Sequence, residues 1–441
     1  MKKCITPINI VYFLITSIIV NSYLLVKLSS YILFAIIPLF LAINIVAGLR
    51  LDTKRRRIKI CNHGSVLLAV FSASLIPSII YHIVLAFITI PHSYLDLIHS
   101  AIFCTVASSV VFWNGIISVY CTSASLGIRW RVIGALCGFV PILNLIVLTK
   151  IVDVTKDEVE FELEKEKIAA DPALAEMCKT KYPILLVHGV FFRDSKWFSY
   201  WGRIPRTLKA HGATVYYGEH QSALAIKDSA RELSARIKLV AERSGAGKVN
   251  IIAHSKGGLD CRYAISELGV APYVASLTTI NTPHRGCIFA ERLLNAVPEK
   301  VKDGVATAYN VTLTDLGDES PDFLAAVSDL TAEACTKRDK YMTMPDGIYT
   351  QSVGSIMPHH KSSQFPLNLS YRYVKNFDGE NDGLVGESSF EFGERYTLLR
   401  PKGNRGISHA DIIDMWRKDV PGFDVRGFYV ELVRDLRDRG L

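Results

Sequence analysis

The segment that decides the fold runs from Val249 to Asp260 and reads VNIIAHSKGGLD. A short apolar run opens it and a helix-compatible stretch follows its two glycines, so we predict a strand, a tight turn and a helix. Ser255 stands at the apex of the turn, with Ala253 two positions before it and Gly257 two positions after it. Small residues at these positions allow a strained corner that holds a serine hydroxyl at a helix N-terminus. Taken alone, the pattern also fits an ordinary turn that contains a serine.

Strands and helices alternate on both sides of this segment. Strand-like runs occupy 182–188, 213–217, 248–253 and 273–281, and helix-like runs occupy 197–211, 225–244 and 423–439. Such alternation predicts an α/β domain with a mostly parallel sheet covered by helices on both faces. The alternation stops at about 287–346, where helix-prone segments with apolar faces indicate an insertion. This insertion is either a mobile lid or a static cap.

The first third of the chain has a different composition. Residues 1–150 carry 12 Lys or Arg and 2 Asp or Glu, whereas the remaining residues carry 38 Lys or Arg and 40 Asp or Glu. The excess of positive charge therefore lies in the first third and does not indicate nucleic-acid binding by the globular part. Apolar runs at 5–26, 28–49, 65–90 and 97–121 each reach the about 20 residues that span a bilayer. We therefore expect an all-α, multi-pass transmembrane domain over 1–152, a charged helical linker over 153–180 and a globular domain over 181–441.

The orientation of this domain follows from its charges. Six basic residues lie between Arg50 and Lys59, in the loop after the second apolar run. Positive loops face the cytoplasm, so the N-terminus is expected there. The fifth, weaker run at 131–149 contains Pro141 and Asn144. If it crosses, the globular domain lies outside the cell, which is the expectation adopted here; if it is re-entrant, the domain lies inside, where its four unpaired-looking cysteines also fit.

A serine hydroxyl needs a base, and a histidine base needs a carboxylate to fix its tautomer. Where the nucleophile sits on a strand-turn-helix corner, the acid follows the serine and the histidine comes last. Asp382 lies in the loop DGENDGLV at 378–385, and His409 is the only histidine downstream of it. Asp378 is the alternative acid, and Asp382 also fits a simple turn.

The developing oxyanion needs backbone donors. One candidate is the N–H of Lys256, directly after Ser255. The other is the N–H of Val190, because Gly189 lets the loop after the first strand come close. His188 and His254 are expected to support the structure rather than to act as the base.

These motifs occur in an order that resembles the bacterial triacylglycerol lipases. The resemblance rests on YPILLVHG at 182–189, the segment around Ser255, TPHRG at 282–286, NDG at 381–383 and HAD at 409–411. It covers about 180–441 and is similar to the Pseudomonas and Burkholderia group, with clostridial membrane-attached lipase-like proteins as the nearest type. It implies an α/β-hydrolase fold with a helical lid, a triad of Ser255, Asp382 and His409, and oxyanion donors at Val190 and Lys256.

The implied activity is hydrolysis of carboxylic esters, with acylglycerols as the expected substrates, by an enzyme anchored in a bacterial cell membrane and without an organic cofactor. A phospholipase, a lysophospholipase or an acyltransferase would use the same triad, and a catalytically silent scaffold is the alternative outside enzymes. Asp411 matches one carboxylate of that group's structural calcium site. The residues at 347–377, where the other carboxylate should stand, contain neither Asp nor Glu, so no metal is expected.

Overall fold

The computed structural model describes residues 6–89, 94–138, 140, 142–190, 199–296, 298–315, 318–400 and 405–441. The chain divides into two compact units, Met1–Ala170 and Asp171–Leu441. This division falls inside the predicted linker at 153–180. The linker is not a separate helix, however, because α7 runs without a break from Leu143 to Ala170.

Helices are the only regular elements among the described residues of the first unit. Its helices are α1 (Pro7–Val20), α2 (Tyr23–Leu28), α3 (Leu33–Val46), α4 (Arg56–Thr89), α5 (Tyr94–Thr122), α6 (Gly127–Cys137) and α7. Two of the described helices, α4 and α5, are long and apolar enough to cross a membrane. The apolar runs at 5–26 and 28–49 form shorter helices, so their spanning of a membrane stays a prediction.

The long helices α4 and α5 pack closely at a pair of glycines. A Cβ atom added to Gly64 would lie 2.7 Å from the carbonyl oxygen of Gly115. Small residues at such a crossing let two helix backbones approach each other. The outward faces of both helices carry exposed apolar side chains, for example Ile79, Phe87 and Trp113.

The second unit is built on a six-stranded parallel sheet in the order β2-β1-β3-β4-β5-β6. The strands are β1 (Ile184–Val187), β2 (Val215–Tyr217), β3 (Val249–His254), β4 (Val274–Ile280), β5 (Tyr349–Ser355) and β6 (Arg395–Leu399). The predicted α/β-hydrolase fold is confirmed; β5 and β6 lay outside the predicted strands. The sheet is fully buried in its middle, where every residue of β3 and β4 is buried.

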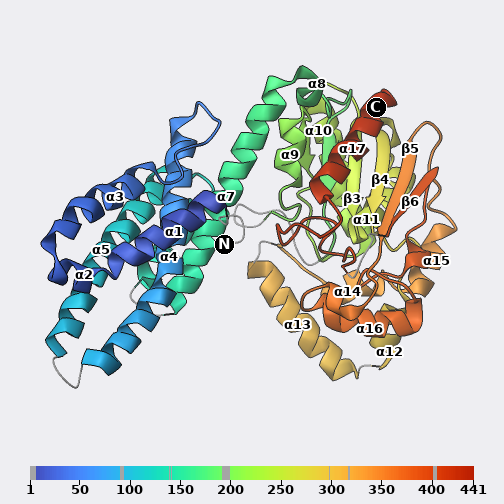
Figure 1. Ribbon diagram of the computed structural model, residues 1–441. Coiled ribbons are helices and arrows are strands. Elements are labelled where there is room, and N and C mark those ends of the chain that lie inside the picture. Colours follow the sequence, from blue (N-terminus) through green and yellow to red (C-terminus); the bar gives the residue numbers. More distant parts are fainter. Residues whose placement is uncertain are drawn as a thin grey trace. The chain divides into compact units, whose positions relative to one another are not determined.

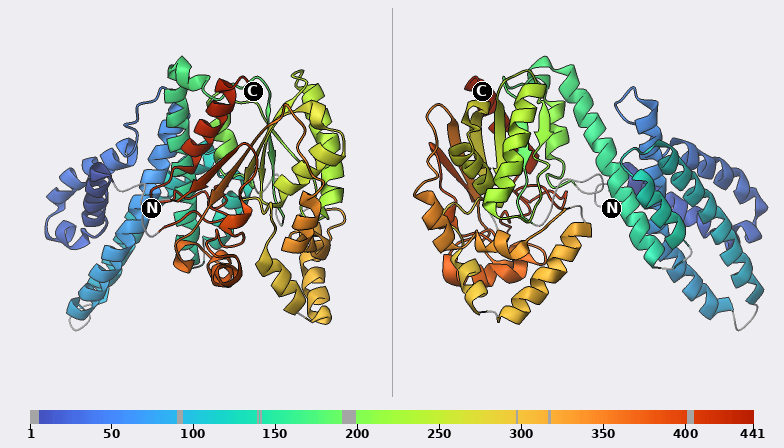
Figure 2. Two further views of the ribbon diagram at one scale, coloured as in Figure 1. Left: turned by 90° about the vertical axis from the view of Figure 1, so that its right-hand side faces the viewer. Right: turned by 180° about the vertical axis from the view of Figure 1, so that it is seen from behind.

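Helices cover both faces of the sheet, as expected for a parallel sheet. One face packs against α9 (Ile204–Ala210) and α17 (Val425–Asp438), through residues such as Leu208 and Tyr429. The other face packs against α10 (Ile226–Arg243) and α11 (Lys256–Glu267), through residues such as Leu233 and Ala264. Figures 1 and 2 show the two layers.

The predicted insertion forms helices between β4 and β5. They are α12 (Ile288–Ala296), α13 (Glu299–Asp315), α14 (Phe323–Ser328) and α15 (Ala332–Asp339). Together with α16 (Leu367–Asp378), the helices α12, α13 and α14 gather at one end of the sheet (Figures 1 and 2). The short helix α8 (Pro172–Ala175) opens the unit. All cysteines that the structure describes are free thiols, and the four in this unit are buried.

Candidate active site

Ser255 occupies a strained corner between β3 and α11. Its φ of 55° lies in the left-handed region that non-glycine residues rarely adopt. The corner closes tightly, because a Cβ atom added to Gly257 would lie 2.3 Å from the carbonyl oxygen of His188. Ala253, on the strand before the turn, pairs with Val187 of β1. The small residues around the serine are therefore required by the close contact of helix and strand.

Asp382 and His409 meet in the structure. Oδ2 of Asp382 lies 2.6 Å from Nδ1 of His409, and the backbone N–H of His409 donates to the carbonyl of Asp382 at 2.9 Å. Asn281 donates to Oδ2 at 2.6 Å, and the N–H groups of Leu384 and Val385 donate to Oδ1 at 2.9 and 2.8 Å. These donors fix a fully buried carboxylate. Because Nδ1 faces that carboxylate, the free Nε2 is the nitrogen that can accept a proton.

Asp378 has a different partner. Its carboxylate accepts from the backbone N–H groups of Ile288 at 2.9 Å and Phe289 at 2.8 Å. These are the first residues of α12, whose N–H groups have no partner within the helix. Asp378 therefore caps the first helix of the insertion, and only Asp382 of the two candidate acids contacts His409.

A second histidine lies beside the base. The rings of His254 and His409 are 4.4 Å apart. Nδ1 of His254 lies 2.6 Å from Oη of Tyr200, which accepts from the N–H of Gly189 at 3.0 Å. Burial, together with the nearby His409, lowers the pKa of His254 well below its usual value, so this histidine is neutral. None of the described hydrogen bonds joins Ser255 to His409, and such catalytic bonds are often loose without substrate.

The two expected oxyanion donors lie next to the serine. A Cβ atom added to Gly189 would lie 2.8 Å from Cβ of Ser255, so the loop that leads to Val190 passes directly over the nucleophile. Val190 is buried in a small cluster with Ala223, Leu313 of α13 and Ala326 of α14. His188 supports this loop: Nδ1 lies 2.9 Å from the carbonyl of Gly189. The rest of the loop, 191–198, lies outside the described residues.

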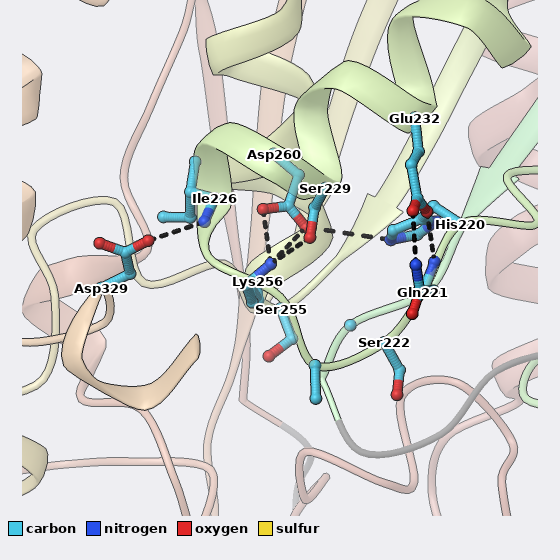
Figure 3. Close-up of polar contacts among 12 residues, drawn as sticks. His220, Gln221, Ser222, Ile226, Ser229, Glu232, Ser255, Lys256, Asp260 and Asp329 are labelled. Carbon is cyan, nitrogen blue, oxygen red and sulfur yellow. Dashed lines mark hydrogen bonds and ion pairs between the residues drawn. The ribbon is translucent and has the colours of Figure 1, made fainter. Parts of the chain in front are cut away.

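Lys256 is the first residue of α11 and has no free side chain. Nζ donates to both carboxylate oxygens of Asp260, at 2.8 and 3.0 Å, and to Oγ of Ser229 on α10 at 2.8 Å. Figure 3 shows that its side chain points into the protein while the hydroxyl of Ser255 points the other way. Sequence reasoning missed Tyr200, Asn281 and Ser229, since each belongs to no recognised motif and meets the site only through the fold. It also missed the role of Asp260, although the spacing of four residues from Lys256 on a predicted helix was a local signal for their ion pair.

The residues around Asp411 do not fit a calcium site. Its carboxylate accepts from the N–H and the hydroxyl of Ser408, at 3.2 and 2.7 Å, and pairs with Arg405 at 3.1 Å. A guanidinium thus stands where a cation would need free oxygens. Across the described part of the chain, no group of three or more His, Cys, Asp or Glu could hold a metal ion.

With this geometry established, the chain can be compared with known proteins. It is 36% identical over 266 residues to triacylglycerol lipase 2 of Saccharomyces cerevisiae, covering 55% of this chain and 74% of that protein. The chain belongs to the triacylglycerol lipase family. It also shares 37% identity over 177 residues with a triacylglycerol lipase of Burkholderia plantarii and 35% over 186 residues with one of Vibrio cholerae.

These bacterial triacylglycerol lipases are matched only in part. The alignments cover 37% and 40% of this chain and 48% and 58% of the two relatives, so the chain spans about half of their length. No family model matches the sequence. Among solved structures, the mature Bacillus licheniformis lipase BlEst2 is similar, with 23% identity, a TM-score of 0.42 and coverage of 58% of this chain and 92% of that one.

Proposed function

We propose that the protein is a membrane-anchored serine hydrolase that cleaves carboxylic esters of lipids, with acylglycerols as its substrates. The observation that carries the proposal is the 2.6 Å contact between Asp382 and His409, because it connects an acid and a base that follow the strained Ser255 in the order typical of this fold. Membership of the triacylglycerol lipase family supports the same chemistry.

In the proposed reaction, Nε2 of His409 takes the proton of Ser255 while Oγ attacks the ester carbonyl. The N–H groups of Val190 and Lys256 stabilise the oxyanion of the tetrahedral intermediate. His409 then returns the proton to the leaving alcohol, and an acyl-enzyme remains. Water, activated by His409, attacks the acyl group and releases the fatty acid. Asp382 keeps a proton on Nδ1 throughout, so that Nε2 can accept and return the transferred proton, and the carboxylate stabilises the imidazolium that forms.

The test is covalent labelling and turnover in the full chain, purified in detergent. A fluorophosphonate is expected to label the wild-type protein at Ser255, and Ser255→Ala is expected to lose labelling and several orders of magnitude of ester hydrolysis while it folds normally. A panel of triacylglycerols, phospholipids and lysophospholipids separates a lipase from a phospholipase. Absence of both labelling and hydrolysis in wild type would favour a silent scaffold.

We also propose that the hydrolase unit lies on the same side of the membrane as the basic loop, which by its charge is the cytoplasm. Support comes from contacts within the first unit. Arg57, at the start of α4, donates to the carbonyl of Thr122 at the end of α5 and pairs with Glu158 of α7. Arg55 pairs with Glu162 and Glu166, further along α7.

The middle of α7 lies beside the same helix ends. Glu158 accepts from the hydroxyl of Ser123 and from the N–H groups of Ala124 and Ser125, which follow α5. The short helix α6 lies beside both neighbours, since a Cβ atom added to Gly134 would contact Tyr120 of α5 and Ile151 of α7. These contacts favour a re-entrant α6–α7 hairpin over the crossing expected from the run at 131–149. Four buried free thiols in the hydrolase unit are also suited to a reducing compartment.

Protease protection tests this orientation. In spheroplasts of an expressing bacterium, a C-terminal tag is expected to resist added protease until the membrane is broken. A protease site inserted at 91–93, between α4 and α5, is the matched control and should be cut from outside. Cleavage of the tag in intact spheroplasts would show that the hydrolase unit is external.

A further inference from the structure

The buried ion pair behind the nucleophile has no role in the proton transfers proposed above. The side chains of Lys256 and Asp260 are each 1% exposed, and they stand one turn apart on α11. A cation in the first turn of a helix opposes the helix dipole. A buried ion pair also gains little stability over well-packed apolar side chains of similar size. Stability therefore gives a weak reason for these charges at this position.

The ion pair restrains the residue whose backbone N–H is proposed to bind the oxyanion. Lys256 carries the backbone N–H that the proposed mechanism uses for the oxyanion, and the same residue is held at its far end by three hydrogen bonds. Two of these bonds tie the first turn of α11 to its second turn. The third ties it to Ser229, which is fully buried on α10. Figure 3 shows these bonds converging on Nζ.

The backbone strain at Ser255 explains why the N–H of Lys256 needs this restraint. Ser255 is held at a positive φ, so the corner is strained, and an unrestrained first turn of α11 could relax by rotating the N–H of Lys256. An oxyanion donor must stay within a few tenths of an ångström of its position to act in the transition state. A rigid tether on the donor residue itself supplies that restraint.

We propose that the Lys256–Asp260 pair, tethered to α10 by Ser229, is a positioning element that holds the Lys256 N–H in the oxyanion hole. This inference rests on the proposed function and adds to it a requirement behind the nucleophile. The side chain of Lys256 points away from the hydroxyl of Ser255, so the ion pair itself does not contact the substrate. Its removal acts on the transition state and leaves substrate binding unchanged, so it changes kcat and not KM.

The decisive variant replaces both charges by apolar side chains, Lys256→Met with Asp260→Leu, in the full chain in detergent. Its melting temperature is expected to equal or exceed that of wild type. Turnover of a short-chain p-nitrophenyl ester is expected to fall by about 10-fold or more in kcat with KM unchanged. The inhibition constant of a boronic acid, which mimics the tetrahedral intermediate, should rise by a similar factor.

A control separates position from the mere loss of a buried cation. Arg262 is 4% exposed on the same helix and pairs with Asp339, away from Ser255. The double variant Arg262→Met with Asp339→Leu is expected to keep kcat within about twofold of wild type. Ser229→Ala removes only the tether to α10, and we expect a smaller fall in kcat at an unchanged melting temperature. This single variant carries the test if the apolar double variant does not fold.

The two proposals fail in different ways. Wild-type kcat in a folded Lys256→Met/Asp260→Leu variant, or in Ser229→Ala if only that variant folds, would overturn the positioning role while the hydrolase assignment stands. An equal loss of kcat in the Arg262 control would also overturn it. A wild-type chain with neither labelling nor turnover would overturn the hydrolase assignment and, with it, the positioning role.

Discussion

Oδ2 of Asp382 receives both Nδ1 of His409 and the side-chain amide of Asn281, each at 2.6 Å. One carboxylate oxygen thus connects the end of β4 with the last loop of the domain. Asp378, only four residues earlier, instead caps α12. Two acids of one short loop therefore serve two different segments, and substitutions should separate their roles.

Asp382→Asn is expected to reduce kcat by about 10³- to 10⁴-fold, because an amide stabilises the wrong tautomer of the base. Asp378→Asn should leave kcat within a few-fold of wild type and cost less than about 1 kcal/mol, because the amide oxygen of Asn can still accept from the first turn of α12. Steady-state kinetics and thermal melts of the two variants measure the contrast. The reverse pattern would mean that Asp378 is the acid.

Gly257→Ala is expected to destabilise the hydrolase unit by about 1–3 kcal/mol, because its Cβ atom would meet the backbone oxygen of His188 at 2.3 Å. Gly304, on α13, has open space around an added Cβ atom. Gly304→Ala is therefore the matched control and should gain about 1 kcal/mol in helix propensity. Chemical denaturation compares the two, and equal stabilities would contradict the close packing at the corner.

Chelation with EGTA should leave both activity and the melting temperature unchanged, because Arg405 already neutralises Asp411. Arg405→Ala tests the same point, because it removes the partner of the Asp411 carboxylate. This variant should have a lower melting temperature than wild type, by the same amount with and without calcium. A fall in melting temperature with EGTA, reversed by added calcium, would show that ligands outside this group complete a metal site.

Stability should depend on pH through Asp260. Burial raises the pKa of this carboxyl from 3.8 to about 6, against the opposing effects of Lys256 and Arg338; Asp329 raises it slightly further. His220 also faces it, with Nε2 at 3.9 Å. Between pH 4 and 6 the folded state retains a proton that the unfolded state has lost, so this contribution to stability falls as pH rises through that window.

The comparison that isolates this effect is urea denaturation of wild type and of the Lys256→Met/Asp260→Leu variant at pH 4, 5, 6 and 7. The difference in unfolding free energy should shift in favour of the variant as pH rises to 6 and then stay level. A difference that is constant from pH 4 to 7 would show that Asp260 titrates normally.

The sequence predicted those features that depend on local spacing or on the order of residues along the chain. The corner at Ser255 follows from small residues two positions away, and His409 follows from being the only histidine after Asp382. The partners of these residues could not be predicted in the same way. Tyr200 contacts His254, which is 54 positions away in the sequence, and Asn281 contacts Asp382, which is 101 positions away. Contacts at such separations produce no local sequence pattern.

The membrane half shows the same limit. The run at 5–26 is uncharged and mostly apolar, yet it forms α1 and α2 with a break at Asn21. The side chain of Asn21 donates to the carbonyl of Ser17 and to the hydroxyl of Ser78 on α4, at 2.7 and 2.8 Å. Length and hydropathy cannot reveal that one polar residue will turn toward a helix that comes later in the chain.

The burial of Val190 against Leu313 and Ala326 gives the insertion a second consequence. If α13 and α14 open as a lid to admit a long acyl chain, they must first separate from Val190, whose N–H we propose as one oxyanion donor. The same few contacts would therefore control both access to the site and the position of the oxyanion donor. Leu313→Ala should therefore lower KM for bulky esters and lower kcat at the same time. A change in preferred substrate size at this position would then come with a loss of rate.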